Sequence, residues 1–348
     1  DIRPCTGCFT CYDGVARGLV QQCMANPALF KGAEYMKVES APVKKKVLVI
    51  GSGAAGLESA RVAALRGHEV ILCEREKSLG GALPLAGMIT DFHIDFLGLS
   101  KWLIRQVEKL GVDIRTKTTV DRAFVEKLNP DAIIVAVGAS ENLPSIPGIN
   151  KKIVTTSEKL HAQLKSATKF FDVESLGKLS KLFLPLGKRV AIIGGGIHGL
   201  QTAAFLIKRG REVVILEEGP ELGKGMLDCG PKPNMLRWLT ALGIEMHRNI
   251  KIDEICDNGV AIIDEAGDPR IIPASDVIPV LPMRGNLALY EELKDAASEF
   301  YAIGDCNPKE FDDSTFPPLK LEPVGTAPMW PRFTAPAINE AYRICREI

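Results

Sequence analysis

The sequence has no excess of charge of either sign, few aromatic residues, and no apolar run long enough to cross a bilayer. Its 43 basic and 43 acidic residues give a formal net charge of zero, and aromatic side chains make up 6%. Balanced charge excludes the basic surface that typically holds nucleic acid or an anionic membrane. The longest apolar stretches have the length of strands and are broken by glycine or charge. We therefore expect no nucleic-acid partner and no membrane partner.

Length and cysteine usage narrow the class further. The chain has 348 residues, of which 46% are hydrophobic, and this size predicts two or three domains of a globular protein. Nine cysteines are an odd number in a chain this long, which does not resemble a secreted disulfide scaffold. The cysteine usage fits a reducing compartment better, and we therefore expect a cytoplasmic protein.

Two segments of the chain resemble each other closely, Lys46–Arg75 and Arg189–Glu218. Each reads as a β-branched apolar run, then G-x-G-x-x-G, then a helical stretch, then a second apolar run closed by Glu. This pattern is one βαβ unit with its start and stop signals. A single motif would be weak evidence, whereas two complete units predict an α/β protein with two Rossmann-like domains.

Each glycine of these motifs has its own physical role. The first allows the tight turn, the second lets the backbone approach a pyrophosphate, and the third lets helix and strand pack closely. Glu74 and Glu217 stand at the tips of the second strands, where a carboxylate accepts hydrogen bonds from ribose hydroxyls. The alternative is that the second unit is a structural copy that binds nothing. The six glycines are Gly51, Gly53, Gly56, Gly194, Gly196 and Gly199.

Two dinucleotide folds, the second inserted into the first, resemble the flavoproteins typified by glutathione reductase. The resemblance implies that the first unit binds FAD and the second a nicotinamide nucleotide. It also implies that Asp305, in a late strand ending Gly-Asp, bonds the ribityl chain of the flavin. Further FAD-binding positions implied by the resemblance are Ala55, Gly81, Gly138 and Gly304.

The predicted domains follow from this arrangement. Residues 41–150 and 290–348 form the FAD-binding domain, and residues 151–289 form the NAD(H)-binding domain. Residues 1–40 precede them as a small separate segment, which the cysteine pattern described below predicts to bind a [4Fe-4S] cluster. The Pro-rich residues 307–333 are interpreted as an ordered surface excursion, and the chain should end with a helix.

The second unit favours NADH over NADPH. The Glu217 carboxylate would repel a 2′-phosphate, whereas Lys208, Arg209 and Arg211 are interpreted as a solvated helix end rather than a phosphate clamp. His198 stands inside the second glycine motif, where it could touch a phosphate, although an exposed first-turn side chain is the simpler interpretation.

Four cysteines fall within the first 23 residues with the spacing C-x2-C-x2-C-x11-C. Four thiolates suit either zinc or an iron–sulfur cluster. Three cysteines in one tight loop with a fourth standing alone favour a [4Fe-4S] cluster over the paired knuckles of a zinc ribbon, and disulfides fit the spacing least. Gly7 leaves room for backbone N–H groups to reach sulfur. The proposed ligands are Cys5, Cys8, Cys11 and Cys23.

The stretches IRPCTGCFTC, GAEY, VLVIGSGAAGLESARVAALRGHEV and LGGAL are similar to the iron–sulfur flavoenzymes related to old yellow enzyme. These are 2,4-dienoyl-CoA reductase, 2-enoate reductase and trimethylamine dehydrogenase. The resemblance covers the part of those enzymes that follows an FMN-bearing TIM barrel. It implies that electrons pass from NADH through FAD and a [4Fe-4S] cluster to that barrel. The spacing before the third cysteine, x2 rather than x3, is more similar to that of trimethylamine dehydrogenase.

The chain departs from the disulfide reductases, since neither a C-x4-C after the first βαβ unit nor a C-x-x-C in the second is present. It also contains no run of eight βα units, so no catalytic residue is assignable. We expect the FMN barrel to be a separate subunit of a hetero-oligomer or to lie just beyond residue 1. Two alternatives stay open: a trimethylamine dehydrogenase-like module whose second domain holds ADP, and a subunit that binds nucleotides without turnover.

Overall fold

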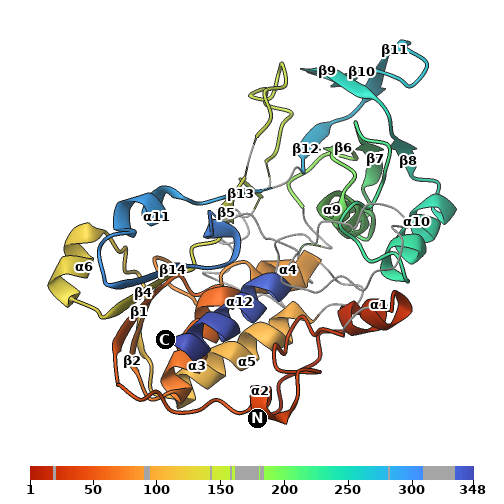
Figure 1. Ribbon diagram of the computed structural model, residues 1–348. Coiled ribbons are helices and arrows are strands. Elements are labelled where there is room, and N and C mark those ends of the chain that lie inside the picture. Colours follow the sequence, from red (N-terminus) through yellow and green to blue (C-terminus); the bar gives the residue numbers. More distant parts are fainter. Residues whose placement is uncertain are drawn as a thin grey trace. The chain divides into compact units, whose positions relative to one another are not determined.

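A computed structural model describes most of the chain (Figure 1). The chain divides into two compact units. The first comprises Asp1–Gly87, His93–Ser140 and Arg284–Ile348. The second comprises Met88–Phe92 and Glu141–Met283. These are packing units, and the division by ligand predicted from the sequence stays a prediction. The described residues are 1–18, 21–89, 95–141, 143–156, 159–160, 180, 184–280, 283–308 and 334–348.

The first unit is built on a parallel sheet of five strands in the order β14-β4-β1-β2-β3. A two-stranded antiparallel ribbon, β5 (Ala139–Ser140) with β13 (Arg284–Gly285), continues from it. The five strands are β1 (Lys46–Ile50), β2 (Glu69–Cys73), β3 (Asp113–Arg115), β4 (Ala132–Val135) and β14 (Glu299–Ala302).

Helices cover both faces of this sheet. Three lie side by side, namely α3 (Ala54–Leu65), α5 (Phe96–Lys109) and α12 (Thr334–Glu347) (Figure 1). Val47 and Val49 of β1 pack into their core, while the alternate residues Leu48 and Ile50 pack into a second core on the other face. Because both faces are covered, the strands are apolar throughout rather than alternating. The remaining helices of the unit are α1 (Thr10–Ala16), α2 (Ala33–Met36), α4 (Leu83–Ile89), α6 (Arg122–Leu128), α11 (Ala288–Leu293) and the 3-10 turn η1 (Gly304–Cys306).

The C-terminal helix α12 is confirmed as predicted. It buries Ile338, Ala341, Tyr342 and Cys345, which recur at the three- and four-residue spacing of one helical face. The Pro-rich excursion predicted at residues 307–333 lies outside the described residues from 309 onward.

The second unit repeats the parallel arrangement with four strands in the order β12-β6-β7-β8. An antiparallel sheet of three strands, β9 (Lys251–Cys256), β10 (Gly259–Ile263) and β11 (Pro269–Pro273), packs with it around one apolar core. The fold class is therefore confirmed as α/β with two Rossmann-like domains. The other elements are β6 (Arg189–Ile193), α9 (Ile197–Ile207), β7 (Glu212–Leu216), α10 (Pro231–Ala241), β8 (Glu245–His247) and β12 (Asp276–Pro279).

No helix within the described ranges combines the length and the apolar composition that spanning a bilayer requires.

Candidate dinucleotide and cysteine sites

The first glycine turn joins β1 to α3. Gly51 has φ of +99°, a left-handed conformation that favours glycine, and an ideal Cβ on Gly56 would lie 1.8 Å from the Gly51 carbonyl oxygen. Gly53 differs, since it precedes α3 with φ of −69° and a Cβ there would meet no atom within 4 Å. The turn therefore leaves open space in front of the helix N-terminus, where backbone N–H groups favour an anion.

The buried Glu74 carboxylate holds this turn in shape. Its Oε2 accepts hydrogen bonds from the Ser52 backbone N–H at 2.9 Å and from the Ser52 hydroxyl at 2.6 Å. Its Oε1 accepts a third from the backbone N–H of Glu76 at 2.9 Å. The carboxylate at the tip of β2 is thus tied to the residue between the first two glycines.

The segment after β2 folds back over the same turn. The Gly80 N–H donates to the Ser52 carbonyl at 3.0 Å, and a Cβ on Gly81 would lie 2.8 Å from the Gly53 Cα. Gly81 has φ of +56°, so both its conformation and its surroundings require glycine. The structure therefore brings Gly81 against the turn with which the sequence associated it.

Gly304 lies where three elements meet. A Cβ on it would be 3.2 Å from the Cβ of Ala337 in α12 and 3.7 Å from the Cβ of Ala55 in α3. The Gly304 N–H donates to Glu340 Oε2 at 2.7 Å, and Asn307 Nδ2 donates to Glu340 Oε1 at 2.6 Å. The hydrogen bonds tie this Gly-Asp sequence to α12, and the short distance to Ala55 places Gly304, and hence the neighbouring Asp305, beside the start of α3.

Gly138 follows β4, the neighbour of β1 in the sheet. It has φ of +69°, and its carbonyl accepts a hydrogen bond from the Asn286 N–H at 3.0 Å. A Cβ on Gly51 would lie 2.5 Å from the carbonyl oxygen of Ala136, so the end of β4 runs directly beside the first turn.

The second glycine turn repeats this geometry. Gly194 has φ of +106°, Gly196 precedes α9 with φ of −69°, and a Cβ on Gly199 would lie 1.9 Å from the Gly194 carbonyl oxygen. Glu217 Oε2 accepts the Gly195 N–H at 2.6 Å, and its Oε1 accepts the Gly219 N–H at 2.7 Å. Both repeats thus form a glycine turn held by a carboxylate.

The two turns differ in front of the helix. The Gly223 N–H donates to the Gly195 carbonyl at 2.7 Å, as Gly80 does to Ser52, but the next residue is Lys224 where the first repeat has Gly81. The Lys224 carbonyl accepts the Ile197 N–H at 2.9 Å. The first N–H of α9 is therefore already paired, and a pyrophosphate that used this N–H would have to displace the carbonyl.

His198 lies in the first turn of α9. The interpretation of an exposed side chain is wrong, because His198 is partly buried. Burial disfavours the charged imidazolium and lowers the pKa of His198 to about 4. The imidazole beside the second turn is consequently neutral near pH 7.

The basic residues after α9 do not form a solvated helix end throughout. Arg209 is buried, with its guanidinium 3.4 Å from the centre of the Phe205 ring and donating to Ser180 Oγ at 2.9 Å and to the Phe205 carbonyl at 3.0 Å. The aromatic face and two acceptors make burial of the charge tolerable, which sequence spacing could not reveal. Arg209 also follows the far end of α9, about 16 Å of helix away from the glycine turn, so it is no clamp for a nucleotide phosphate.

The four N-terminal cysteines form the third predicted site. The Gly7 N–H donates to Cys5 Sγ at 3.4 Å, the Asn26 N–H donates to Cys23 Sγ at 3.3 Å, and Cys8 Sγ donates to Thr10 Oγ1 at 3.2 Å. Burial raises the pKa of the Cys23 thiol, and the neighbouring Cys8 and Cys11 raise it further, although backbone N–H groups oppose them. These sulfurs therefore lie close enough to influence one another.

The chemistry of this donor set fits a metal or cluster, because it offers thiols that already accept backbone N–H groups. Within the described part of the chain, however, no three His, Cys, Asp or Glu side chains lie close enough together to hold a metal ion. The four cysteines thus stay predicted ligands.

Comparison of the sequence with known proteins identifies the family of this chain. Residues 45–323, most of the chain, match the pyridine nucleotide-disulphide oxidoreductases. The chain belongs to this family. Membership indicates the flavoprotein class of pyridine nucleotide-dependent oxidoreductases. None of the nine cysteines, all of which lie within the described residues, forms a disulfide there, and Cys73, Cys306 and Cys345 are buried.

Several relatives in the family are much longer than this chain. It is 32% identical over 311 residues to an NADH oxidase of Thermoanaerobacter brockii, with 88% of this chain and 45% of the relative covered. It is 30% identical over 309 residues to a cinnamate reductase of Clostridium sporogenes, with 88% and 43% covered. A 2-naphthoyl-CoA reductase in complex with 2-naphthoyl-CoA superposes with a TM-score of 0.79 at 28% identity, covering 99% of this chain and 46% of that structure. The chain spans about half the length of the relatives it matches.

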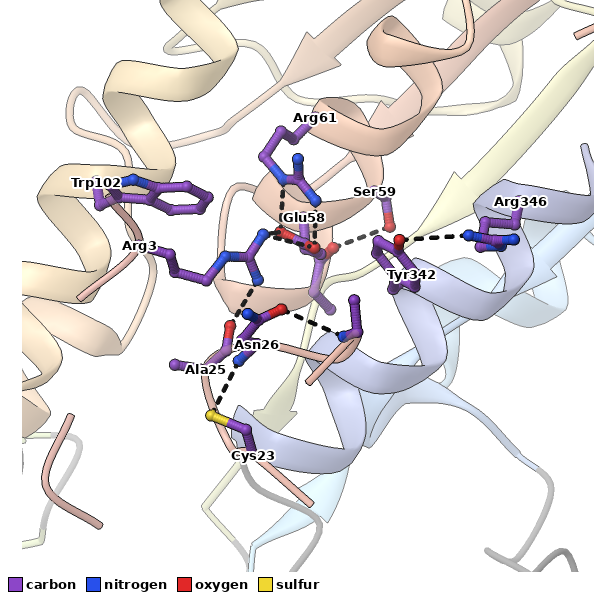
Figure 2. Close-up of polar contacts among 12 residues, drawn as sticks. Arg3, Cys23, Ala25, Asn26, Glu58, Ser59, Arg61, Trp102, Tyr342 and Arg346 are labelled. Carbon is purple, nitrogen blue, oxygen red and sulfur yellow. Dashed lines mark hydrogen bonds and ion pairs between the residues drawn. The ribbon is translucent and has the colours of Figure 1, made fainter. Parts of the chain in front are cut away.

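One group of residues escaped the sequence analysis. Glu58 of α3 pairs with Arg3 and Arg61, and the indole of Trp102 lies beside both guanidinium groups (Figure 2). Desolvation lowers the pKa of Arg3, and the Glu58 carboxylate opposes that shift. A comparison of the two repeats could have indicated this group, because α3 has Glu58 and Arg61 at positions where the second repeat has the uncharged Gln201 and Ala204.

Proposed function

We propose that this chain is the electron-input half of an iron–sulfur flavoenzyme. It takes electrons from NADH and delivers them to an FMN-bearing TIM barrel of the enoate or dienoyl-CoA reductase type. The observation that carries the proposal is the pair of glycine turns, each held by a carboxylate at the tip of the following strand. The similarity to an NADH oxidase and a cinnamate reductase supports the reaction class.

The first turn is the proposed FAD site. Open space beside Gly53 suits a pyrophosphate in front of α3, Glu74 suits the adenosine ribose, and Asp305 beside the start of α3 suits the ribityl chain. Gly51, Ala55, Gly56, Gly81, Gly138 and Gly304 keep the backbone close enough for these contacts.

The second turn is the proposed NADH site. Gly194, Gly196 and Gly199 shape it, and Glu217 would accept hydrogen bonds from the ribose hydroxyls while repelling a 2′-phosphate. A neutral His198 adds no positive charge there. These features support NADH over NADPH as the donor.

The four N-terminal cysteines are the proposed [4Fe-4S] ligands. When bound, FAD accepts a hydride from NADH and releases electrons singly, while a four-iron cluster takes up one electron at a time. The role of the chain is to hold Cys5, Cys8, Cys11 and Cys23 on one segment and to supply N–H donors to their sulfurs. The partner would be a separate subunit or a further part of the same polypeptide, since the relatives are about twice as long.

Anaerobic purification followed by flavin, iron and sulfide analysis tests the proposal. One FAD and about four irons with matching sulfide per chain are expected. Stoichiometric zinc with fewer than about two irons would refute the redox role of the cysteines.

One observation favours the alternative in which the second unit is a structural copy that binds no nucleotide. The Lys224 carbonyl already occupies the first N–H of α9, which leaves the second turn less open than the first. Anaerobic stopped-flow mixing with NADH tests this. Flavin bleaching supports the NADH-dependent enzyme, whereas a flavin that stays oxidised, with no electrons passed to a dye, supports a second unit that takes no part in turnover.

A further inference from the structure

Arg3 connects three separate parts of the first unit (Figure 2). Its Nη1 donates to the Ala25 carbonyl at 2.5 Å, and its Nη2 lies 3.0 Å from both Glu58 carboxylate oxygens. The guanidinium carbon also lies 4.3 Å from the centre of the Trp102 ring. One side chain therefore ties the start of the chain and the segment at Ala25 to helices α3 and α5.

The charges in this group do not cancel. Glu58 also accepts two hydrogen bonds from Arg61, Nε at 2.9 Å and Nη2 at 2.8 Å, so one carboxylate serves two guanidinium groups. The side chains are 0% exposed for Glu58, 11% for Arg3 and 10% for Arg61. Since arginine stays protonated in proteins, the group carries one net positive charge where water screens it poorly.

This positive charge lies beside the cysteine segment, by which we mean the stretch from Cys5 to Cys23 that carries the four N-terminal cysteines. Arg3 precedes Cys5 by two residues, and Ala25, which it holds, follows Cys23 by two residues. The next residue, Asn26, donates its N–H to Cys23 Sγ at 3.3 Å. The short stretch Cys23–Asn26 thus contacts Arg3 on one side and carries the fourth thiol on the other (Figure 2).

The second repeat provides an internal comparison. Where α3 has Glu58 and Arg61, the matching positions of α9 are Gln201 and Ala204. In both repeats a carboxylate accepts the turn N–H, so a glycine turn does not need these charges. The pair on α3 therefore serves the N-terminal segment rather than nucleotide binding.

We propose that Arg3 is a positioning residue that fixes both ends of the cysteine segment on α3 and raises the reduction potential of the cluster bound there. This inference rests on the proposed function, because it assumes that the four cysteines hold a cluster. Reduction adds a negative charge to the cluster, and a nearby buried positive charge stabilises that form more than the oxidised form.

Four variants of the full chain test the charge effect by redox titration of the cluster, followed by its EPR signal. Arg3→Gln removes a positive charge and should lower the midpoint potential, whereas Glu58→Gln removes the compensating negative charge and should raise it. Arg3→Lys keeps the charge and should retain most of the potential. The control Lys109→Gln also removes a positive charge, but from the exposed ion pair between Lys109 and Asp1 at the start of the chain, and it should not shift the midpoint potential.

Opposite shifts for Arg3→Gln and Glu58→Gln identify electrostatics, because damage to packing has no reason to move the potential with the sign of the removed charge. Equal potentials in the wild type, Arg3→Gln and Glu58→Gln, or shifts of the same sign, would overturn the inference. If one Gln variant loses its cluster, the other decides: a fall in Arg3→Gln or a rise in Glu58→Gln, with Arg3→Lys and Lys109→Gln unchanged, supports the inference, and no shift or a shift of the opposite sign refutes it.

A wild-type chain that takes up no cluster would refute the proposed function instead. The positioning role of Arg3 is then measured on the iron-free protein by amide hydrogen exchange over Cys5–Ala16 and Cys23–Asn26. Faster exchange in Arg3→Gln than in Lys109→Gln supports positioning, and equal rates contradict it.

Discussion

Glu74 accepts the backbone N–H of Ser52 at 2.9 Å, and Glu217 accepts that of Gly195 at 2.6 Å, so the same contact occurs at matching places of the two repeats. In each case the second carboxylate oxygen accepts an N–H two residues further along the chain. Each acid is thus oriented by the turn it supports. Its remaining hydrogen-bonding capacity is available to a ribose, which makes each acid both a structural support and a binding group.

Replacing Glu74 should weaken FAD binding. Glu74→Gln removes the charge that accepts three hydrogen bonds and presents an amide donor to other donors. Loss of a hydrogen bond to a charged group costs about 1.5–3 kcal/mol, which corresponds to roughly 10- to 100-fold weaker binding. The measurement is FAD content per purified chain and FAD affinity after removal of the flavin. Glu69→Gln, at the exposed start of β2, is the matched control and should bind FAD normally.

Gly53 and Gly56 should respond differently to alanine. Gly53→Ala places a methyl group in open space, so the flavin-free protein should melt within about 2 °C of the wild type, yet FAD binding should be lost because the methyl occupies the pyrophosphate position. Gly56→Ala should destabilise the flavin-free protein by about 1–3 kcal/mol, since its Cβ would meet the Gly51 carbonyl. Full FAD retention in Gly53→Ala would contradict the location of the site. Gly196→Ala should keep FAD and lose NADH binding.

Glu217 should set the preference between the two nicotinamide nucleotides. The wild type should reduce its flavin with a higher kcat/KM for NADH than for NADPH. Glu217→Gln removes the repulsion of a 2′-phosphate and should shift the ratio toward NADPH by roughly ten-fold. Glu212→Gln, at the exposed start of the same strand, should leave the ratio unchanged. A wild-type preference for NADPH would contradict the assignment.

His198 should make the second unit less stable in acid. Its folded pKa of about 4 lies below the ordinary value of 6.5, so the unfolded chain binds the proton more readily between these values. The stabilisation is therefore complete above pH 6.5 and is lost as the pH falls toward 4. We expect the melting temperature of the wild type to fall more between pH 7 and pH 5 than that of His198→Gln, measured by calorimetry. Identical pH dependence in the two proteins would show that the imidazole titrates normally.

The sequence predicted the repeated parts of this structure well. Paired apolar strands, glycine motifs and closing acids are local patterns, and each appears as predicted, as do the late strand β14 and the C-terminal helix. Glu58 and Arg3 could not be paired in this way, because they are far apart in the chain and only packing brings them together. The error at Arg209 has the same origin: the aromatic ring and the hydroxyl that accompany its burial are tertiary neighbours.

The Lys224 carbonyl is a further feature that the sequence does not reveal. The glycine spacing of the second motif is intact, but a backbone acceptor from the following loop occupies the helix N–H. The glycine motif specifies the conformation of the turn, but it does not specify which atoms of other segments lie at the N-terminus of the following helix. This is why the repeat alone could not show that the two sites differ.

Anaerobic titration with NADH, followed at once by flavin absorbance and by EPR, tests the central claim most directly. The account predicts flavin bleaching by NADH and then the EPR signal of a reduced [4Fe-4S] cluster in the same chain. A flavin that stays oxidised at excess NADH, or a bleached flavin with no cluster signal in iron-loaded protein, would contradict it.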